Sequence, residues 1–405
     1  MAKSKTVWCL LIIAFQFSFA QVDPQIMELV AQVNSDSLYE NLKILTGEKP
    51  ITLFAGPIFI SSRHKDDVGN SYAAEFIYRK FRQYGYETYR QDFQFPGQNI
   101  YAYKPGSKLP NQQLIICAHY DNMPQGNKAP GADDNGSGTA AVLEIARLLK
   151  NVTTDYTIIF ALWDNEEQGL LGSAYYAFQA NSRKDVIIGV INLDMIGYDS
   201  NNDMKMEIHT RDVKESNQMA SKISKLNSFY GIGLSTSIVN PGSASSDHAS
   251  FWNFNYSAVL LIESFADFNA YYHKQTDTID KMNKTFYTKN TQLALASLCD
   301  YAQITISSQE LEIPTLFQLF QNYPNPFNPT TKIRFQINER VHVKLVVFDL
   351  LGNEIAVLKD EVMHPNQYEL HFNAERNNQH LSSGVYFYAL YAGKNFSVKK
   401  MILAK

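Results

Sequence analysis

Histidine and carboxylate side chains recur in this sequence next to apolar segments, where they could bind metal ions. Taken in chain order, five such motifs are His119-x-Asp121, Asp133-Asp134, Glu166-Glu167, Asp194, and His273 followed by Asp277. A single motif of this kind is more often ordinary polarity at a protein surface. Most of the five follow a strand-like segment, and polar groups at the carboxyl ends of parallel strands meet at one edge of a sheet. We therefore expect the motifs to converge on one metal site.

The residue types in these motifs restrict the metal. Histidine and carboxylate ligands without thiolates suit zinc, manganese or cobalt, and the three cysteines of the chain lack the spacing of a zinc–thiolate site. One histidine and one carboxylate for each ion, with a further carboxylate bridging, would make a two-metal centre. In such a centre Glu167 would bind metal while Glu166 acts as a general base, because adjacent residues point in different directions.

The segments that would position these motifs alternate between strand-like and helix-like patterns. In chain order they are a strand over 114–119, a helix over 139–149, a strand over 156–163, a helix from 170, a strand over 186–193, a helix over 213–226 and a strand over 258–262. They are flanked by a helical pattern over 25–45 broken near Ser35, a helix over 71–84, strands over 87–95 and 99–103, and a last helix over 290–306. This alternation predicts an α/β domain with a mixed, mostly parallel central sheet and helices on both faces.

The composition changes after residue 308, where the helix-like patterns end. Residues 312–329 are rich in proline. The alternating segments that follow, over 332–337, 341–349, 367–372 and 384–391, predict a small all-β sandwich. We therefore expect a larger α/β domain over 21–308, a linker over 309–322 and a β-sandwich over 323–405.

The first twenty residues predict export. Lys3 and Lys5 precede an apolar segment over 7–19, which ends in Ser18-Phe19-Ala20. This is the pattern of a signal peptide over 1–20, cleaved after Ala20. A membrane anchor would need roughly 20 apolar residues, and this segment is shorter. Because no later segment is long and apolar enough to cross a bilayer, we expect an exported, soluble protein.

Charge and cysteine content narrow the possible classes further. The chain has 36 basic and 40 acidic residues and a net charge of −4, so we expect no nucleic-acid partner. Cys117 and Cys299 would remain after signal cleavage and could form a disulfide. However, Cys117 lies inside an apolar strand, and a buried free thiol is therefore the expected state.

In this order, the motifs resemble those of the dinuclear zinc aminopeptidases of metallopeptidase family 28. The matching stretches are His119-Tyr120-Asp121, GADDN, NEEQG, NLDMIGY, SSDH and His273-x-x-x-Asp277. The resemblance covers residues 25–308 and implies an α/β/α fold, two zinc ions, and hydrolysis that removes N-terminal residues from peptides. We accordingly expect a secreted, monomeric aminopeptidase that acts on peptide substrates.

The resemblance also implies roles for single residues. One zinc would be held by His119, Asp134 and Asp194. The other would be held by His273, Asp134 and Glu167, with Asp134 bridging the two ions. Glu166 would be the catalytic acid and base, and Asp121 would orient His119. Members of the family often have a cis peptide bond after the bridging aspartate, which here lies between Asp134 and Asn135.

Alternatives stay open for one ligand, for the apolar pocket and for the function. His248 in the SSDH stretch also has the type of a ligand, but this stretch lines the substrate site in the family, which favours His273. Phe251, Trp252 and Phe265 could form an apolar pocket or belong to the core. A glutaminyl cyclase, a distant relative of the aminopeptidases, would keep one zinc and need no bridging carboxylate. A catalytically idle binding protein would have lost part of the ligand set, which is intact here.

The end of the chain resembles a second family. YPNPFNPTT and SSGVYFYALYAGKNFSVKKMILAK resemble the sorting domain of the type IX secretion system, over residues 317–405. This resemblance implies that the type IX machinery is a partner and carries the chain across the bacterial outer membrane. The alternative is a generic β-sandwich, which might serve as a binding module.

Overall fold

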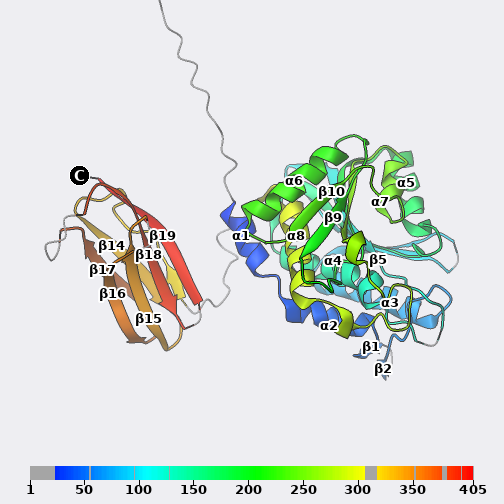
Figure 1. Cartoon of the computed structure of the whole chain (residues 1–405), viewed down its shortest axis with the longest axis horizontal. Helices are drawn as coiled ribbons and strands as arrows, with labels where there is room; N and C mark the ends of the chain where they lie inside the picture. The colour runs from blue at the N-terminus through cyan, green and yellow to red at the C-terminus, as the bar shows by residue number, and fades with distance from the viewer. Residues whose placement is uncertain are drawn as a thin grey trace, which may run out of the picture. The chain divides into compact units, whose positions relative to one another are not determined.

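The computed structural model describes residues 23–53, 56–94, 96–126, 128–305, 317–350, 353–375, 381–393 and 395–404. The chain divides into two units between Ser307 and Ser308 (Figure 1). The expected signal peptide over 1–20 lies outside the described residues, as do positions 309–316 of the expected linker. The domain limits over 21–308 and 323–405 therefore stay predictions.

An eight-stranded sheet forms the centre of the larger unit, in the order β10-β9-β11-β8-β5-β7-β4-β3. Its strands are β3 (Glu87–Asp92), β4 (Gln98–Lys104), β5 (Leu109–His119), β7 (Tyr156–Trp163), β8 (Val186–Leu193), β9 (Lys205–His209), β10 (Ser235–Val239) and β11 (Ala258–Glu263). The four central strands β11, β8, β5 and β7 run parallel, whereas β9 is antiparallel to β11, and β4 to β7. The expected mixed, mostly parallel sheet is confirmed.

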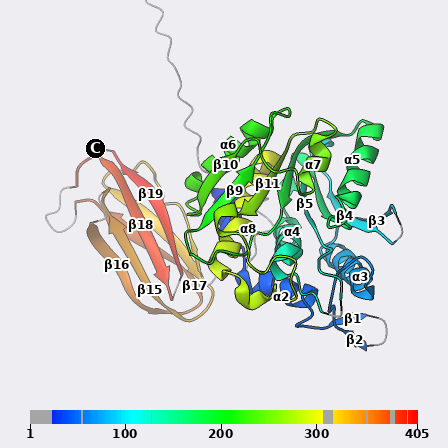
Figure 2. The same cartoon turned by 45° about the vertical axis from the view of Figure 1, so that its right-hand side comes forward.

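Helices cover both faces of this sheet, as expected (Figure 1, Figure 2). They are α1 (Pro24–Ala31), α2 (Ser35–Leu45), α3 (Val68–Gln83), α4 (Gly138–Leu149), α5 (Leu171–Arg183), α6 (Ser216–Phe229), α7 (His248–Trp252) and α8 (Lys284–Ala302). Alternate residues of β5 face opposite layers. Leu114 and Ile116 pack into the core under α4 and α8, while Ile115 and Cys117 pack into a second core under α5 and α7. Burial on both faces explains the continuous apolar sequence of the central strands.

Some element limits differ from the expected ones. The predicted break near Ser35 is confirmed, because Asn34 caps α2 by accepting the N–H groups of Asp36 and Ser37. The last helix begins at Lys284 rather than at residue 290. Asn283 caps its start in the same way as Asn34 caps α2. The sequence reading missed the short strands β9 and β10, whose residues lack a long apolar run. Two minor sheets, β1 (Ile51–Leu53) with β2 (Gly56–Ile58) and β6 (Thr153–Thr154) with β12 (Ile304–Thr305), complete the unit.

The smaller unit consists of two antiparallel sheets. One contains β13 (Phe317–Leu319), β14 (Thr330–Ile337) and β17 (Asn366–Asn373), and the other contains β15 (Val341–Phe348), β16 (Glu354–Met363), β18 (Gly384–Ala392) and β19 (Asn395–Leu403). Alternate apolar residues of both sheets form one core. β13 lies within the range expected to be linker, 309–322, but it pairs with β14 and buries Leu319, so this part of the expected linker belongs to the smaller unit.

None of the helices that the structure describes combines the length and the apolar character that crossing a bilayer requires.

Candidate metal centre

The strands of the larger unit deliver the predicted motifs to one edge of the sheet. His119 is the last residue of β5, Asp194 directly follows β8, and Glu166 and Glu167 lie in the loop after β7. Since these three strands are parallel, their carboxyl ends lie together. Asp134 precedes α4, and His273 lies in the loop after β11.

Five of these side chains form two sets that share Asp134. The Nε2 atom of His119 lies 3.5 Å from Oδ1 of Asp134 and 3.4 Å from Oδ1 of Asp194. The Nε2 atom of His273 lies 3.2 Å from Oδ2 of Asp134 and 2.8 Å from Oε2 of Glu167. In each set, one atom from every residue lies within 4.8 Å of the others. Asp134 therefore turns one carboxylate oxygen toward each histidine.

The residues present fit a divalent cation in each set. Oδ2 of Asp134, Oε1 of Glu167 and Oδ1 of Asp194 are buried and have no hydrogen-bond donor in the part of the chain that the structure describes. Leaving a buried carboxylate oxygen without a partner is costly unless a cation compensates it. The donor set of imidazole and carboxylate without thiolate suits zinc.

The electrostatics of these side chains also favour the binding of cations. Burial raises the pKa of Glu167 to about 8, and the negative charge of Asp134 adds to this effect. Burial likewise raises the pKa of Glu166 well above its ordinary value. Burial alone would lower the pKa of His119, but the carboxylates of Glu166 and Asp194 raise it well above the ordinary value. The carboxylates outnumber the imidazoles, so the cluster attracts positive charge.

Glu166 stands slightly apart from the two sets. Its Oε2 atom lies 4.0 Å from Nε2 of His119, and the side chain is largely buried. It also forms a third group of possible ligands with His119 and Glu167. The geometry thus allows Glu166 to act beside the metals or to bind one of them.

Asp121 is fully buried and supports the site in two ways. Its carboxylate accepts the backbone N–H groups of Glu166, at 3.1 Å, and Glu167, at 3.2 Å. Nδ1 of His119 lies 3.2 Å from the carbonyl oxygen of Asp121 and 3.5 Å from its carboxylate. A ring N–H donated from Nδ1 leaves Nε2 as the ligand atom. Besides lying beside His119, as expected, Asp121 therefore fixes the loop that carries both glutamates.

The two flanking aspartates of the motifs fasten the loops around Asp134. The carboxylate of Asp277 accepts the N–H groups of Asp133 and Asp134, both at 3.1 Å. The carboxylate of Asp133 accepts the N–H of Gly197 at 2.8 Å, which holds the loop after Asp194. The peptide bond between Asp134 and Asn135 is cis, as the family resemblance predicts.

Arg63 is a buried residue of the site region that the sequence reading missed. Its guanidinium donates to the carbonyl oxygens of Tyr120, Leu45 and Pro130, each at 2.7 Å, and of Gly131 at 2.8 Å. It joins the end of α2 to the loops on both sides of the metal cluster. A lone arginine in an irregular segment carries no sequence signal for such a role.

His248 lies away from both ligand sets. It is fully buried, its Nε2 donates to the carbonyl oxygen of Ser243 at 2.8 Å, and its ring meets that of Trp252 edge to face. Burial lowers the pKa of His248 to about 4, so the ring is neutral. The structure thus brings together His273, and not His248, with the carboxylates.

A small apolar pocket adjoins the metal cluster. Its apolar lining consists of Met195, Leu260, Ile262, Phe265, Phe268 and Tyr272. His119, Asp134 and both glutamates also line the pocket, and its volume is about 100 Å³. Of the three aromatic residues considered for such a pocket, only Phe265 lines it. Phe251 and Trp252 belong to the core under α5 and α7.

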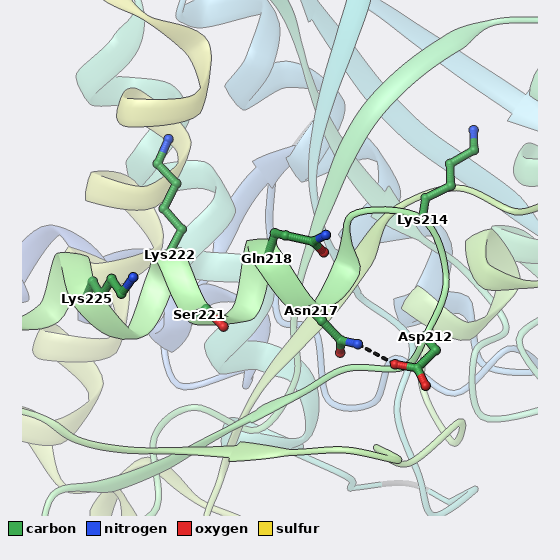
Figure 3. A pocket seen from close by; sticks show the side chains of 7 residues that line it. All are labelled: Asp212, Lys214, Asn217, Gln218, Ser221, Lys222 and Lys225. Carbon is green, nitrogen blue, oxygen red and sulfur yellow. Dashed lines mark hydrogen bonds between the residues drawn. The ribbon is translucent and has the colours of Figure 1, made fainter.

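A second hollow lies on the surface of α6 and shares no lining residue with the pocket beside the histidine and carboxylate cluster (Figure 3). Its side chains come from α6 and the preceding loop, and Asn217 donates to Asp212 there. Lys222 is paired with Asp300 and lies over the ring of Tyr301. Because this hollow has no histidine or carboxylate cluster among the residues that line it, it does not compete with the metal centre.

The expected state of the cysteines is confirmed. Cys117 and Cys299 are both buried free thiols, and Cys117 lies in the core under α5 and α7.

Comparison with known proteins identifies both units. Residues 99–298 match the sequence profile described as Peptidase family M28, and residues 321–404 match that of the Secretion system C-terminal sorting domain. Aminopeptidase YwaD of Bacillus subtilis strain 168 is 32% identical over 197 residues, which cover 46% of this chain and 41% of that protein. The chain spans about half the length of the first curated relatives that it matches, between 41% and 60%.

Solved structures share the fold of the larger unit. The LapA aminopeptidase of Legionella pneumophila has a TM-score of 0.61 at 23% identity, covering 75% of this chain and 80% of that one. The glutaminyl cyclase of Porphyromonas gingivalis has a TM-score of 0.56 at 18% identity, covering 66% of this chain and 98% of that one. At such identities the likeness establishes the fold alone.

Proposed function

Given that the larger unit of this chain belongs to peptidase family M28, we propose that it is a metallo-aminopeptidase with two zinc ions that removes N-terminal residues from peptides. One observation carries the proposal. Asp134 turns its two carboxylate oxygens toward two different histidines, each of which has a further carboxylate beside it. A single-metal site would have no need of this shared carboxylate.

The ligand sets follow from these contacts. His119, Asp134 and Asp194 would hold one zinc. His273, Asp134 and Glu167 would hold the other. When bound, zinc lowers the pKa of a coordinated water toward neutrality and polarises a carbonyl group. Asp121 keeps His119 and the loop of Glu167 in place, because it contacts both.

Glu166 is the residue that would move the proton. Its carboxylate lies at the edge of the cluster and lines the apolar pocket, so it can reach the water and the scissile bond together. As a general base it would take the proton of the attacking water, and as a general acid it would give this proton to the leaving amine. Burial raises the pKa of Glu166, which makes its carboxylate a stronger base toward the attacking water.

The surroundings of the cluster favour an exopeptidase. A free α-amino group is positively charged and would bind beside the acidic cluster, while the side chain of the same residue enters the adjoining apolar pocket. The pocket is small and its lining includes six apolar or aromatic side chains, which suits one side chain of the substrate rather than a longer peptide segment.

A glutaminyl cyclase is the second candidate, because the cyclase of Porphyromonas gingivalis shares the fold. Such an enzyme would use one zinc and would not need the carboxylate of Asp134 between two ions. The number of metal ions therefore separates the two candidates.

The smaller unit belongs to the sorting domains of secretion systems, and it marks the chain for export. We propose that the type IX machinery is its partner. A chain that joins these two units would then be an exported peptidase.

A panel of aminoacyl-nitroanilides, assayed with the metal content of the same preparation, tests the proposal. We expect two zinc ions for each chain, release of nitroaniline, and loss of activity on treatment with a chelator. Fully active protein with one ion, which cyclises N-terminal glutamine and releases no nitroaniline, would establish the cyclase instead.

A further inference from the structure

Two buried ionisable residues lie behind the wall of the apolar pocket and have no part in the proposed mechanism. Glu207 and His209 are 8% and 1% exposed and project from the same face of β9. On the adjacent strand β11 they stand opposite Ile262 and Leu260, which line the pocket. They are therefore next to the pocket without entering it.

The two side chains form a continuous hydrogen-bonded chain. The backbone N–H of Ser243 donates to Nδ1 of His209 at 3.0 Å, and Nε2 of His209 lies 3.0 Å from Oε2 of Glu207. Because Nδ1 accepts a hydrogen bond, the ring proton sits on Nε2 and is donated to Glu207. The other carboxylate oxygen of Glu207 accepts the backbone N–H of Phe265 at 3.3 Å and the hydroxyl of Ser264 at 3.4 Å.

This chain connects the two loops that wall the pocket. Ser243 lies in the loop after β10, and Phe265 lies in the loop after β11; both line the pocket. The ring of His209 also packs against that of Phe265, with centroids 4.9 Å apart. On the other side, a Cβ atom added to Gly242 would lie 2.7 Å from Cβ of His209, so this loop rests directly on the histidine.

Packing alone would not call for this pair. A buried carboxylate beside a neutral imidazole costs desolvation energy, and apolar residues of similar volume often stabilise a protein as well or better. What the pair provides is direction, since Nδ1 of His209 binds the loop after β10, one oxygen of Glu207 binds the loop after β11, and the remaining two polar atoms bind each other. Together with His248, which binds the carbonyl oxygen of Ser243, the pair sets the spacing between Ser243 and Phe265.

We propose that Glu207 and His209 are positioning residues that fix the width of the apolar pocket and so select peptides whose first residue has a large apolar side chain. This inference rests on the proposed aminopeptidase function. Five apolar residues of the pocket lining offer contact to a large apolar side chain of the substrate: Met195, Leu260, Ile262, Phe265 and Phe268. A small side chain leaves these walls untouched and is insensitive to their spacing.

Glu207→Gln is the sharpest test because it keeps the size of the side chain. An amide has one acceptor oxygen, so it cannot accept from both His209 and the N–H of Phe265. We expect the ratio of kcat/KM for leucyl-nitroanilide to that for alanyl-nitroanilide to fall about 10-fold, within the range by which apolar pockets discriminate. The loss should appear mainly in KM for the leucyl substrate, with two zinc ions retained.

His209→Gln is a second variant, which removes the contact with the loop after β10 instead. With its amide nitrogen in the place of Nε2, the glutamine can still donate to Glu207, but its oxygen does not occupy the position of Nδ1, so the N–H of Ser243 loses its acceptor. The same ratio should fall, and the KM for the leucyl substrate should rise. If either folded variant keeps the wild-type ratio, or loses activity equally on both substrates, the inference is overturned.

Glu144→Gln is the matched control. Glu144 is a fully buried glutamate of α4 that accepts from Ser37 and the N–H of Asn34, far along the sequence from the pocket loops. It should lower the melting temperature but leave the leucyl-to-alanyl ratio unchanged. A wild-type protein that holds zinc and cleaves neither nitroanilide would contradict the proposed function itself. Failure of the proposed function can therefore be distinguished from failure of the pocket inference.

Discussion

At the scale of single residues, Glu166 and Glu167 are neighbours in the chain with different surroundings. Glu167 lies 2.8 Å from Nε2 of His273, whereas Glu166 reaches only the edge of the cluster. We expect Glu166→Gln to keep both metal ions and to lower kcat by a factor of about 100 or more, as loss of a general base does. Glu167→Gln should release one ion. Metal analysis and kinetics of both variants check this; equal metal loss in the two would show that Glu166 is a ligand.

A second prediction separates His248 from His273. His273 lies between Asp134 and Glu167, while Nε2 of His248 is occupied by the carbonyl oxygen of Ser243. His273→Ala should therefore bind one zinc ion fewer than the wild type, measured by elemental analysis after dialysis. His248→Ala should retain both ions. The reverse pattern would place the ligand in the SSDH stretch.

The lowered pKa of His248 also predicts that the folded protein loses stability in acid. Its pKa is about 4 in the folded chain, because of burial, against about 6.5 in an unfolded chain. Between about pH 6.5 and pH 4, His248 is protonated in the unfolded state but not in the folded state. The free energy of unfolding therefore decreases as the pH falls through this range, by up to about 3 kcal/mol. His248→Gln keeps a donor for Ser243 and should show a smaller loss over this range. Urea unfolding of both proteins at pH 7 and pH 5 measures the difference, and parallel curves would contradict it.

Among the structural elements, Arg63 joins the end of α2 to two parts of the loop between β5 and Asp134. Its guanidinium satisfies four buried carbonyl oxygens at the end of α2 and in the loops around the metal cluster. A lysine offers one nitrogen and cannot span these four positions, and each buried acceptor left without a donor costs about 1–3 kcal/mol.

We therefore expect Arg63→Lys to lower the melting temperature by about 5 °C or more and to weaken zinc binding. Thermal unfolding and zinc titration with a competing chelator measure the two effects. Arg79→Lys is the control, because Arg79 is half exposed and pairs with Glu75 at the surface. Melting of Arg63→Lys at the wild-type temperature would show that the four hydrogen bonds do not stabilise the site.

At the scale of the whole molecule, the chain has two units with separate cores. All the side chains placed in the metal centre belong to the larger unit. Units of this size with their own cores usually fold independently.

Truncation after Ser308 should therefore leave kcat and KM on small substrates unchanged. In the producing bacterium, the same truncation should leave the enzyme in the periplasm, because the sorting domain is missing. Fractionation of the culture followed by nitroanilide assays measures both effects. Normal secretion of the truncated chain would refute the sorting role, and loss of activity only on large or insoluble substrates would indicate a binding module.

The type of fold and the candidate ligand residues, with their order along the chain, could be predicted from the sequence alone. Long apolar segments such as 114–118 report burial on both faces, and the polar residues at their ends lie where parallel strands finish. These are local signals, so they can be read without knowledge of the packing. The short edge strands β9 and β10 have weaker patterns and were found only in the structure.

The contacts that hold these candidate ligand residues in place form only in the folded chain. Arg63 contacts Gly131 across 68 positions, Asp277 contacts Asp133 across 144, and Glu207 contacts Phe265 across 58. In each case a polar side chain binds a backbone group, and every residue but proline has a backbone N–H and carbonyl. The partner's identity therefore leaves no trace in the sequence, and the contact exists only once the chain has folded.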